Sequence, residues 1–183
     1  MTFNVTEALA DFTRRYVELW QEKTRFPPAS SELYGVPSPC IERTGDGVVH
    51  WLPRPFSPQE KLRQVETALD IRLQESIHDY YTMQLAGDMV AHFGEQNLSL
   101  IQVWSEDDFI RLQENLIGHL VTQKRLKLSP TVFIGTTESE MGLISVCNLT
   151  GQVILEQFGR HDRTTLSEDL ASFLSALTPV MVS

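Results

Sequence analysis

The run from Ser105 to Lys127 constrains the fold of this chain most strongly, because it combines a helical hydrophobic period with a helical distribution of charge. Its apolar residues recur at helical spacing, at Phe109, Leu112, Leu116 and Leu120, with Ile117 and Val121 widening the stripe. Three carboxylates open the run and three cations close it, as the helix dipole favours: Glu106, Asp107 and Asp108, then Lys124, Arg125 and Lys127. Ser105, with Asp108 three residues later, is typical of a capped start. The run therefore predicts a long amphipathic helix with an acid cluster in its first turn.

The N-terminal part of the chain predicts a second helix, from Asn4 to about Gln21. Asn4 can cap this helix, and Glu7 follows at the third helical position. The apolar residues form one stripe: Val5, Leu9, Phe12, Tyr16, Leu19 and Trp20. Pro27 and Pro28 prevent any continuation.

Three further helical segments are expected from caps and periodicity. Residues 57–60 (Ser, Pro, Gln, Glu) have the composition of a helix start, and the buried face of this helix would be Leu62, Val65 and Leu69. A second piece is expected at residues 75–81. A last amphipathic helix is expected at residues 165–177, with one apolar face made by Leu166, Leu170, Phe173, Leu174 and Leu177.

Short apolar runs between turn residues predict strands at residues 88–93, 98–103, 131–135, 143–149 and 153–158. The first two runs flank residues 94–97 and the last two flank residues 150–152, so each pair is expected to form a hairpin. The proline-rich stretch 26–58 is expected to be irregular, with one short strand at residues 47–52 after a turn signal.

The order of these elements predicts an α+β fold, because helices and strands do not alternate as regular βαβ repeats. We expect one domain over residues 1–183, a length that can enclose a substantial core. The sheet is expected to be mixed or antiparallel, with about five to six strands and helices packed against it.

The charge balance narrows the class of partner. The formal net charge is −9, from 24 acidic and 15 basic residues. Nucleic acid is therefore not expected as a partner, since phosphate binding needs clustered Lys and Arg. An anionic lipid surface is disfavoured for the same reason. A cationic protein partner remains compatible with this charge.

The sequence indicates a cytoplasmic protein. Residues 1–11 already contain Glu7 and Asp11 and have no basic region, so we expect no secretory signal. No stretch approaches the roughly 18 apolar residues that a membrane span requires. Cys40 and Cys147 lie far apart and form no CxxC pair, as expected for two partly buried thiols in a reducing compartment.

No pattern in the sequence indicates catalysis, a metal or a cofactor. Cys40 could pair with His50 or His92 as nucleophile and base, but their spacing does not favour this arrangement. The densest candidate metal ligands are divided between a predicted helix and a predicted strand: His78, Asp79, Asp88 and His92. Neither GxGxxG nor GxxxxGK[ST] occurs, so nucleotide binding has no motif. We therefore predict a protein that is not an enzyme, without catalytic, metal or cofactor residues.

The acid cluster has two interpretations. Carboxylates in a first helical turn stabilise the helix by about 0.3–1 kcal/mol each, and this alone can account for Glu106, Asp107 and Asp108. However, residues 86–115 contain six acids and a single cation, Arg111. If the predicted hairpin lies beside the helix start, Asp88 joins the cluster. Our hypothesis is that Asp88, Glu106, Asp107 and Asp108 lie on a surface that binds a basic partner.

Several long phrases resemble the Syd family of gamma-proteobacteria: ELYGVPSPCI (32–41), YTMQLAGDM (81–89), WSEDDF (104–109), ENLIGHLVTQKRLKL (114–128) and ISVCNLTGQV (144–153). The resemblance covers essentially the whole chain, with variable stretches near residues 21–30 and 159–164. Syd proteins resemble the wider SUKH superfamily, and residues 65–87 are similar to its opening helix pair, which leads into the central sheet.

The resemblance implies a cytoplasmic protein that binds SecY and monitors or regulates the SecYEG translocon. Cytosolic loops of an inner-membrane channel are rich in Lys and Arg, so an acidic surface would complement them. The protein would then be peripheral to the cytoplasmic side of the inner membrane, held through protein and not through lipid. Two alternatives remain open, namely an immunity protein that inhibits a toxin, as many SUKH members do, and a small hydrolase that uses Cys40.

Overall fold

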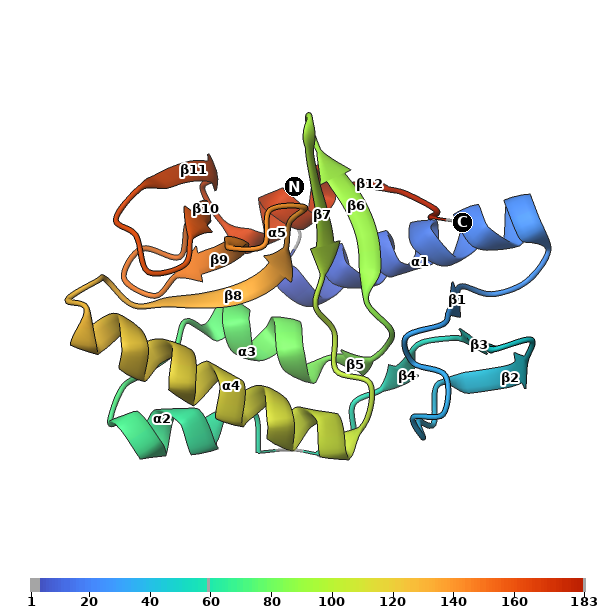
Figure 1. Ribbon diagram of the computed structural model, residues 1–183, viewed down its shortest axis with the longest axis horizontal. Coiled ribbons are helices and arrows are strands. Elements are labelled where there is room, and N and C mark those ends of the chain that lie inside the picture. The colour runs from blue at the N-terminus through green and yellow to red at the C-terminus, as the bar shows by residue number, and fades with distance from the viewer. Residues whose placement is uncertain (1–3, 59, 183) are drawn as a thin grey trace.

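A large antiparallel sheet is the centre of the computed structural model, which describes residues 4–58 and 60–182 (Figure 1). Within these residues it has seven strands in the order β11-β10-β9-β8-β7-β6-β12, and every neighbouring pair is antiparallel. Their bounds are β6 Met89–Phe93, β7 Gln96–Leu100, β8 Thr131–Thr136, β9 Gly142–Cys147, β10 Val153–Gln157, β11 Arg163–Ser167 and β12 Thr178–Pro179. The predicted α+β class is confirmed. The sheet exceeds the predicted strand number because the edge strands β11 and β12 were not expected.

All five predicted strands lie in this sheet, with one change of bounds that matters for the site. The turn between β6 and β7 contains only residues 94 and 95, because Phe93 pairs with Gln96. The strand β7 therefore begins and ends earlier than predicted, at Gln96 and Leu100. Residues 101–104 leave the sheet, although the amide of Ile101 still donates to the carbonyl of Ile134 (2.8 Å). The prediction that residues 101–103 continue the strand is wrong.

The helices pack against the sheet and against each other. Figure 1 shows α2, α3 and α4 gathered below the sheet, with α1 running behind it. α1 contacts α3, α5 and β12, while α4 contacts α2 and β8. The bounds are α1 Val5–Thr24, α2 Arg63–Leu69, α3 Glu75–Thr82, α4 Glu106–Arg125 and α5 Leu170–Ser175. The core between these elements includes the fully buried side chains of Phe12, Ile77, Met89, Leu116, Ile134 and Phe173.

The long helix α4 has its predicted start and its predicted buried face. The hydroxyl of Ser105 accepts a hydrogen bond from the amide of Asp108 (3.1 Å), so the predicted cap is present. Four stripe residues are buried, namely Phe109, Leu112, Leu116 and Leu120. Val121, which was expected to widen the stripe, is 37% exposed. The buried face is therefore narrower than the sequence indicated.

The predicted helix start at residues 57–60 is wrong. Lys61 has a φ of +51°, which is incompatible with a right-handed helix, and α2 begins only at Arg63. Residue Gln59 of the predicted start lies outside the described residues. The amide of Leu62 instead donates to Nδ1 of His78 on α3 (3.2 Å). A tertiary contact therefore replaces the local cap.

The predicted helix at residues 165–177 is wrong in its first part. Residues 163–167 form β11, which pairs along β10 at the edge of the sheet. The helix α5 is shorter and is capped by Asp169, whose carboxylate accepts from the amide of Ser172 (2.7 Å). The β-branched Thr164 and Thr165 suit a strand better than a helix, and this explains the change.

The proline-rich stretch forms small sheets beside the main one. β3 (Val48–Trp51) confirms the strand predicted at residues 47–52, and it lies between β1 (Ala29–Ser30) and β2 (Ile41–Gly45). Asp46 and Gly47 both have positive φ, as a tight hairpin turn requires. A second pair, β4 (Arg54–Pro55) with β5 (Gln84–Leu85), fixes residues 54–57 beside the start of β6.

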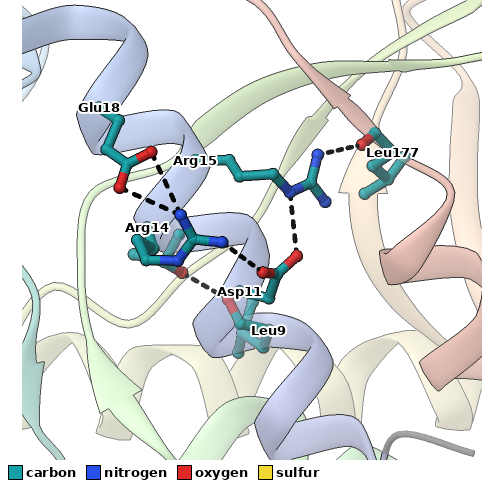
Figure 2. Close-up of polar contacts among 7 residues, drawn as sticks. Leu9, Asp11, Arg14, Arg15, Glu18 and Leu177 are labelled. Atoms are coloured by element: carbon teal, nitrogen blue, oxygen red, sulfur yellow. Dashed lines mark hydrogen bonds and ion pairs between the residues drawn. The ribbon is translucent and has the colours of Figure 1, made fainter. Parts of the chain in front are cut away.

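Charged residues on α1 tie this helix to the C-terminal segment (Figure 2). Arg15 donates to the carbonyl of Leu177 (2.9 Å) and to the carboxylate of Asp11 (3.0 Å). Arg14 contacts the same carboxylate, and its hydrogen bond is the largest cause that lowers the pKa of Asp11. These contacts hold the segment at Leu177 against α1, next to β12 at the edge of the sheet.

Candidate functional site

The four acids predicted as a partner surface line one groove. This groove has a volume of about 1150 Å³ and lies between the start of α4 and residues 32–39, 54–57, 85–88 and 101–105. Asp88 reaches it from the segment before β6, and Glu106, Asp107 and Asp108 reach it from the first turn of α4. The structure therefore brings together two acidic stretches that the sequence separates.

Of the three carboxylates in the first turn of α4, one makes hydrogen bonds within the fold and two are exposed. Asp108 accepts from the amide of Trp104 (2.9 Å) and from Nε of Arg111 (3.1 Å), and its side chain is only 17% exposed. Glu106 and Asp107 are exposed at the edge of the groove. Glu106 has one long contact from the hydroxyl of Ser57 (3.5 Å). Asp107 and Glu106 are thus better placed than Asp108 to meet a ligand.

Asp88 lines the groove, and the pKa of its carboxyl is raised. Surrounding protein atoms disfavour its ionised form, and the charges of Asp108 and Glu32 act in the same direction. The amide of Gln102 donates to Asp88 (2.9 Å) and partly offsets these effects. The net effect raises the pKa of Asp88 to about 6, although its side chain remains open to the groove.

A wall of the groove that the sequence did not indicate comes from residues 32–39. The indole of Trp104 donates to the carbonyl of Val36 (2.9 Å), and the hydroxyl of Ser38 donates to the carbonyl of Trp104 (2.6 Å). These bonds hold the loop against the start of α4 and bring Glu32 to the groove. Glu32 was missed because it lies far away in the sequence. The phrase at residues 32–41 that resembles the Syd family includes Glu32, but it gave no sign that this residue lies near the other acids.

The cations of the groove are already paired. Arg54 contacts Glu42 (3.3 Å) and donates to the carbonyl of Pro39 (3.3 Å), while Arg111 contacts Asp108. Among the described lining residues, these two arginines face five carboxylates: Glu32, Asp88, Glu106, Asp107 and Asp108. The groove is therefore a concave anionic surface that suits Lys and Arg side chains.

Cys40, a candidate for catalysis, and His78, a candidate for metal binding, are both part of the buried interior. Cys40 is fully buried, and burial is the main cause that raises the pKa of its thiol, which disfavours a nucleophilic thiolate. His78 accepts from the amide of Leu62 (3.2 Å) and contacts Glu66 (3.2 Å). Over residues 4–58 and 60–182, no group of three or more His, Cys, Asp or Glu side chains is arranged to hold a metal ion. Among the helices described, none is long and apolar enough to cross a membrane.

Comparison with known proteins finds matches over nearly the whole chain. The family described as Syd protein (SUKH-2) matches residues 6–179. The chain is 70% identical over 183 residues to Protein Syd of Photorhabdus laumondii subsp. laumondii, with 100% of both chains covered. It is 59% identical over 181 residues to Protein Syd of Yersinia pestis (strain Pestoides F), with 99% of both chains covered.

Proposed function

The chain belongs to the Syd protein family, and we propose that it is a non-catalytic protein that binds the basic cytosolic loops of SecY through its acidic groove. Through this contact it monitors or regulates the SecYEG translocon. It is then held at the cytoplasmic side of the inner membrane by a protein partner, and lipid has no direct part in the association.

The observation that carries the proposal is the common position of Asp88, Glu106, Asp107 and Asp108 along one groove. A first-turn acid cluster on its own is explained by the helix dipole. The dipole does not account for Asp88 or Glu32, which come from other elements and line the same hollow. A shared anionic surface accounts for all five acids at once.

The charge of the partner supports the same reading. Cytosolic loops of inner-membrane proteins carry an excess of Lys and Arg. Complementary charges accelerate encounter and exclude partners of the wrong sign. Because Arg54 and Arg111 are already paired within the chain, they offer little repulsion to an incoming cation.

The test is a charge reversal at Asp107, which is exposed at the edge of the groove. If Asp107 serves only the helix dipole, Asp107→Lys lowers stability by at most about 1 kcal/mol and leaves binding intact. If Asp107 meets a partner cation, the variant loses about tenfold or more in affinity for solubilised SecYEG.

The matched control is Glu168→Lys, which reverses an exposed acid that does not line the groove. Thermal unfolding and SecYEG binding are measured on the wild type and both variants. Equal affinity of all three proteins would contradict a role for the groove.

A further inference from the structure

A second hollow continues the acidic groove along α4. It has a volume of about 560 Å³ and lies between α4, β8 and the segment that joins β8 to β9. Its walls are largely apolar and include Phe133, Leu143, Phe158 and the exposed side chain of Met141. We call this hollow the apolar compartment, and the one carboxylate among its described lining residues is that of Glu140.

The two hollows adjoin each other along α4, and we call them together the trough. Both are lined by Ile101, Asn115 and Phe133, so they meet at that point. The α4 residues that line them are spaced three or four apart and share one helix face: Asp108, Arg111, Asn115, Gly118 and Thr122. At about 1.5 Å per residue, this face spans roughly 20 Å. The trough is thus acidic at the start of α4 and mainly apolar beyond Asn115.

The floor at the junction is fixed by two tyrosines of α3. The hydroxyl of Tyr80 donates to the carbonyl of Ile101 (2.9 Å), and the hydroxyl of Tyr81 donates to the carbonyl of Phe133 (2.6 Å). Here β7 and β8 pair over only two registered positions, Ser99 with Thr136 and Leu100 with Gly135. Beyond these positions the amide of Ile101 still donates to the carbonyl of Ile134 (2.8 Å), and the tyrosines hold the carbonyls of Ile101 and Phe133.

Gly118 lines the apolar compartment. It lies in the middle of α4, where glycine is unfavourable for a helix. A Cβ placed there would meet no atom within 4 Å among the described residues. Close packing against a neighbouring element therefore does not explain the glycine. The space above it belongs to the trough.

We propose that the trough is one binding site for an extended segment that carries basic residues and, nearby, a large apolar side chain such as Leu or Phe. The basic residues meet the acids at the start of α4, and the apolar side chain enters the compartment above Gly118. The ten helical steps from Asp108 to Gly118 span about 15 Å, which an extended chain covers in about four to five residues. This inference rests on the proposed function and adds to it a second specificity of the partner.

The test uses fluorescent peptides and the intact protein. One peptide has a short run of Lys followed, about five residues on, by Leu. A second peptide replaces this Leu with Ser, and a third replaces the Lys run with Ser. We expect wild type to bind the Leu peptide about tenfold or more tightly than the Leu→Ser peptide, because burial of a Leu side chain contributes at least that factor.

Gly118→Leu places an apolar side chain at the compartment, and its Cβ meets no atom within 4 Å among the described residues. It should remove the difference between the first two peptides and leave the affinity for the Leu→Ser peptide unchanged. Val121→Leu is the matched control, since it enlarges an exposed residue of the same helix that does not line the trough. Thermal unfolding confirms that both variants fold.

The outcomes separate this inference from the function on which it rests. If wild type binds both Lys peptides equally, the apolar compartment is not part of the site, and the acidic groove stands. If wild type binds the Lys peptides no better than the Lys→Ser peptide, the acidic groove itself fails. If the protein sediments as a dimer that Gly118→Leu disrupts, the trough is occupied by a second copy and the proposal is overturned.

Discussion

Asp88 is a residue whose charge changes within an accessible pH range, since its pKa is raised from 3.8 to about 6. The groups that face it are Asp108, Glu32 and Arg111. A carboxyl with a raised pKa favours the folded state most when it is protonated. Its contribution to stability is therefore fully present below its unfolded pKa and is lost as pH rises through about 6.

Binding of a cation should have the opposite dependence on pH. The ionised form of Asp88 attracts Lys or Arg, so we expect affinity for a Lys-rich peptide to rise between pH about 5 and about 7. Asp88→Asn should flatten this rise and lower the affinity above pH 6. The measurement is fluorescence anisotropy across that range, with Glu168→Gln as control. An unchanged pH profile in Asp88→Asn would exclude Asp88 from the site.

Leu116 tests the core beneath the groove. Its side chain is 0% exposed and belongs to the buried face of α4. Leu116→Ala should lower the free energy of unfolding by about 2–5 kcal/mol, since the removed atoms leave a cavity. Ile110→Ala, at a residue that is 52% exposed on the same helix, should change it by about 0.5 kcal/mol or less. Urea denaturation measures both, and equal effects would contradict the packing of α4.

At the level of single elements, local signals predicted α4 and α1 well because their caps and stripes are local. Ser105 and Asn4 cap these helices as expected. The start of α2 failed for the opposite reason. Residues 57–60 have a local helix signal, but a hydrogen bond from Leu62 to His78 and the positive φ of Lys61 place the start at Arg63. A contact between elements cannot be predicted from the composition of one of them.

Gly118→Ala tests whether α4 would be more stable with a better helix-forming residue at this position. An added Cβ meets open space among the described residues, so Gly118→Ala should raise the free energy of unfolding by up to about 1 kcal/mol. Urea denaturation of the two proteins gives this value. A loss of stability would show that the glycine is required by packing and would contradict the open space beside it.

At the scale of the whole molecule, the sequence predicted the sheet better than the site. The five apolar runs are all strands of the main sheet because alternation and turns are read along the chain. The groove is built from five separate segments, and its wall at residues 32–39 depends on the bonds of Trp104 to Val36 and Ser38. Asp88 and the α4 acids were predicted because their stretches adjoin one hairpin. Glu32 has no such neighbour in the sequence.

The charge of the whole molecule leads to the last prediction, which concerns salt. With a net charge of −9 and an acidic groove, association with SecY-containing vesicles should weaken as salt is raised. The screening length falls from about 8 Å at physiological salt to about 3 Å at 1 M, so exposed pairs at Glu106 and Asp107 should contribute little there. Vesicles made only of lipid, with an anionic composition, should bind little, because their surface has the same sign of charge as the protein.

An apolar contact is not screened in this way, so the trough predicts a residual affinity at high salt. Gly118→Leu should lower this residual binding and leave the salt-sensitive part intact. Asp107→Lys should lower the salt-sensitive part and leave the residual binding intact. Vesicle co-sedimentation across a salt series measures both parts. Binding that does not weaken with salt would contradict the electrostatic account. If wild-type binding disappears completely at high salt, the apolar compartment is not part of the interface, and the acidic groove is the whole of it.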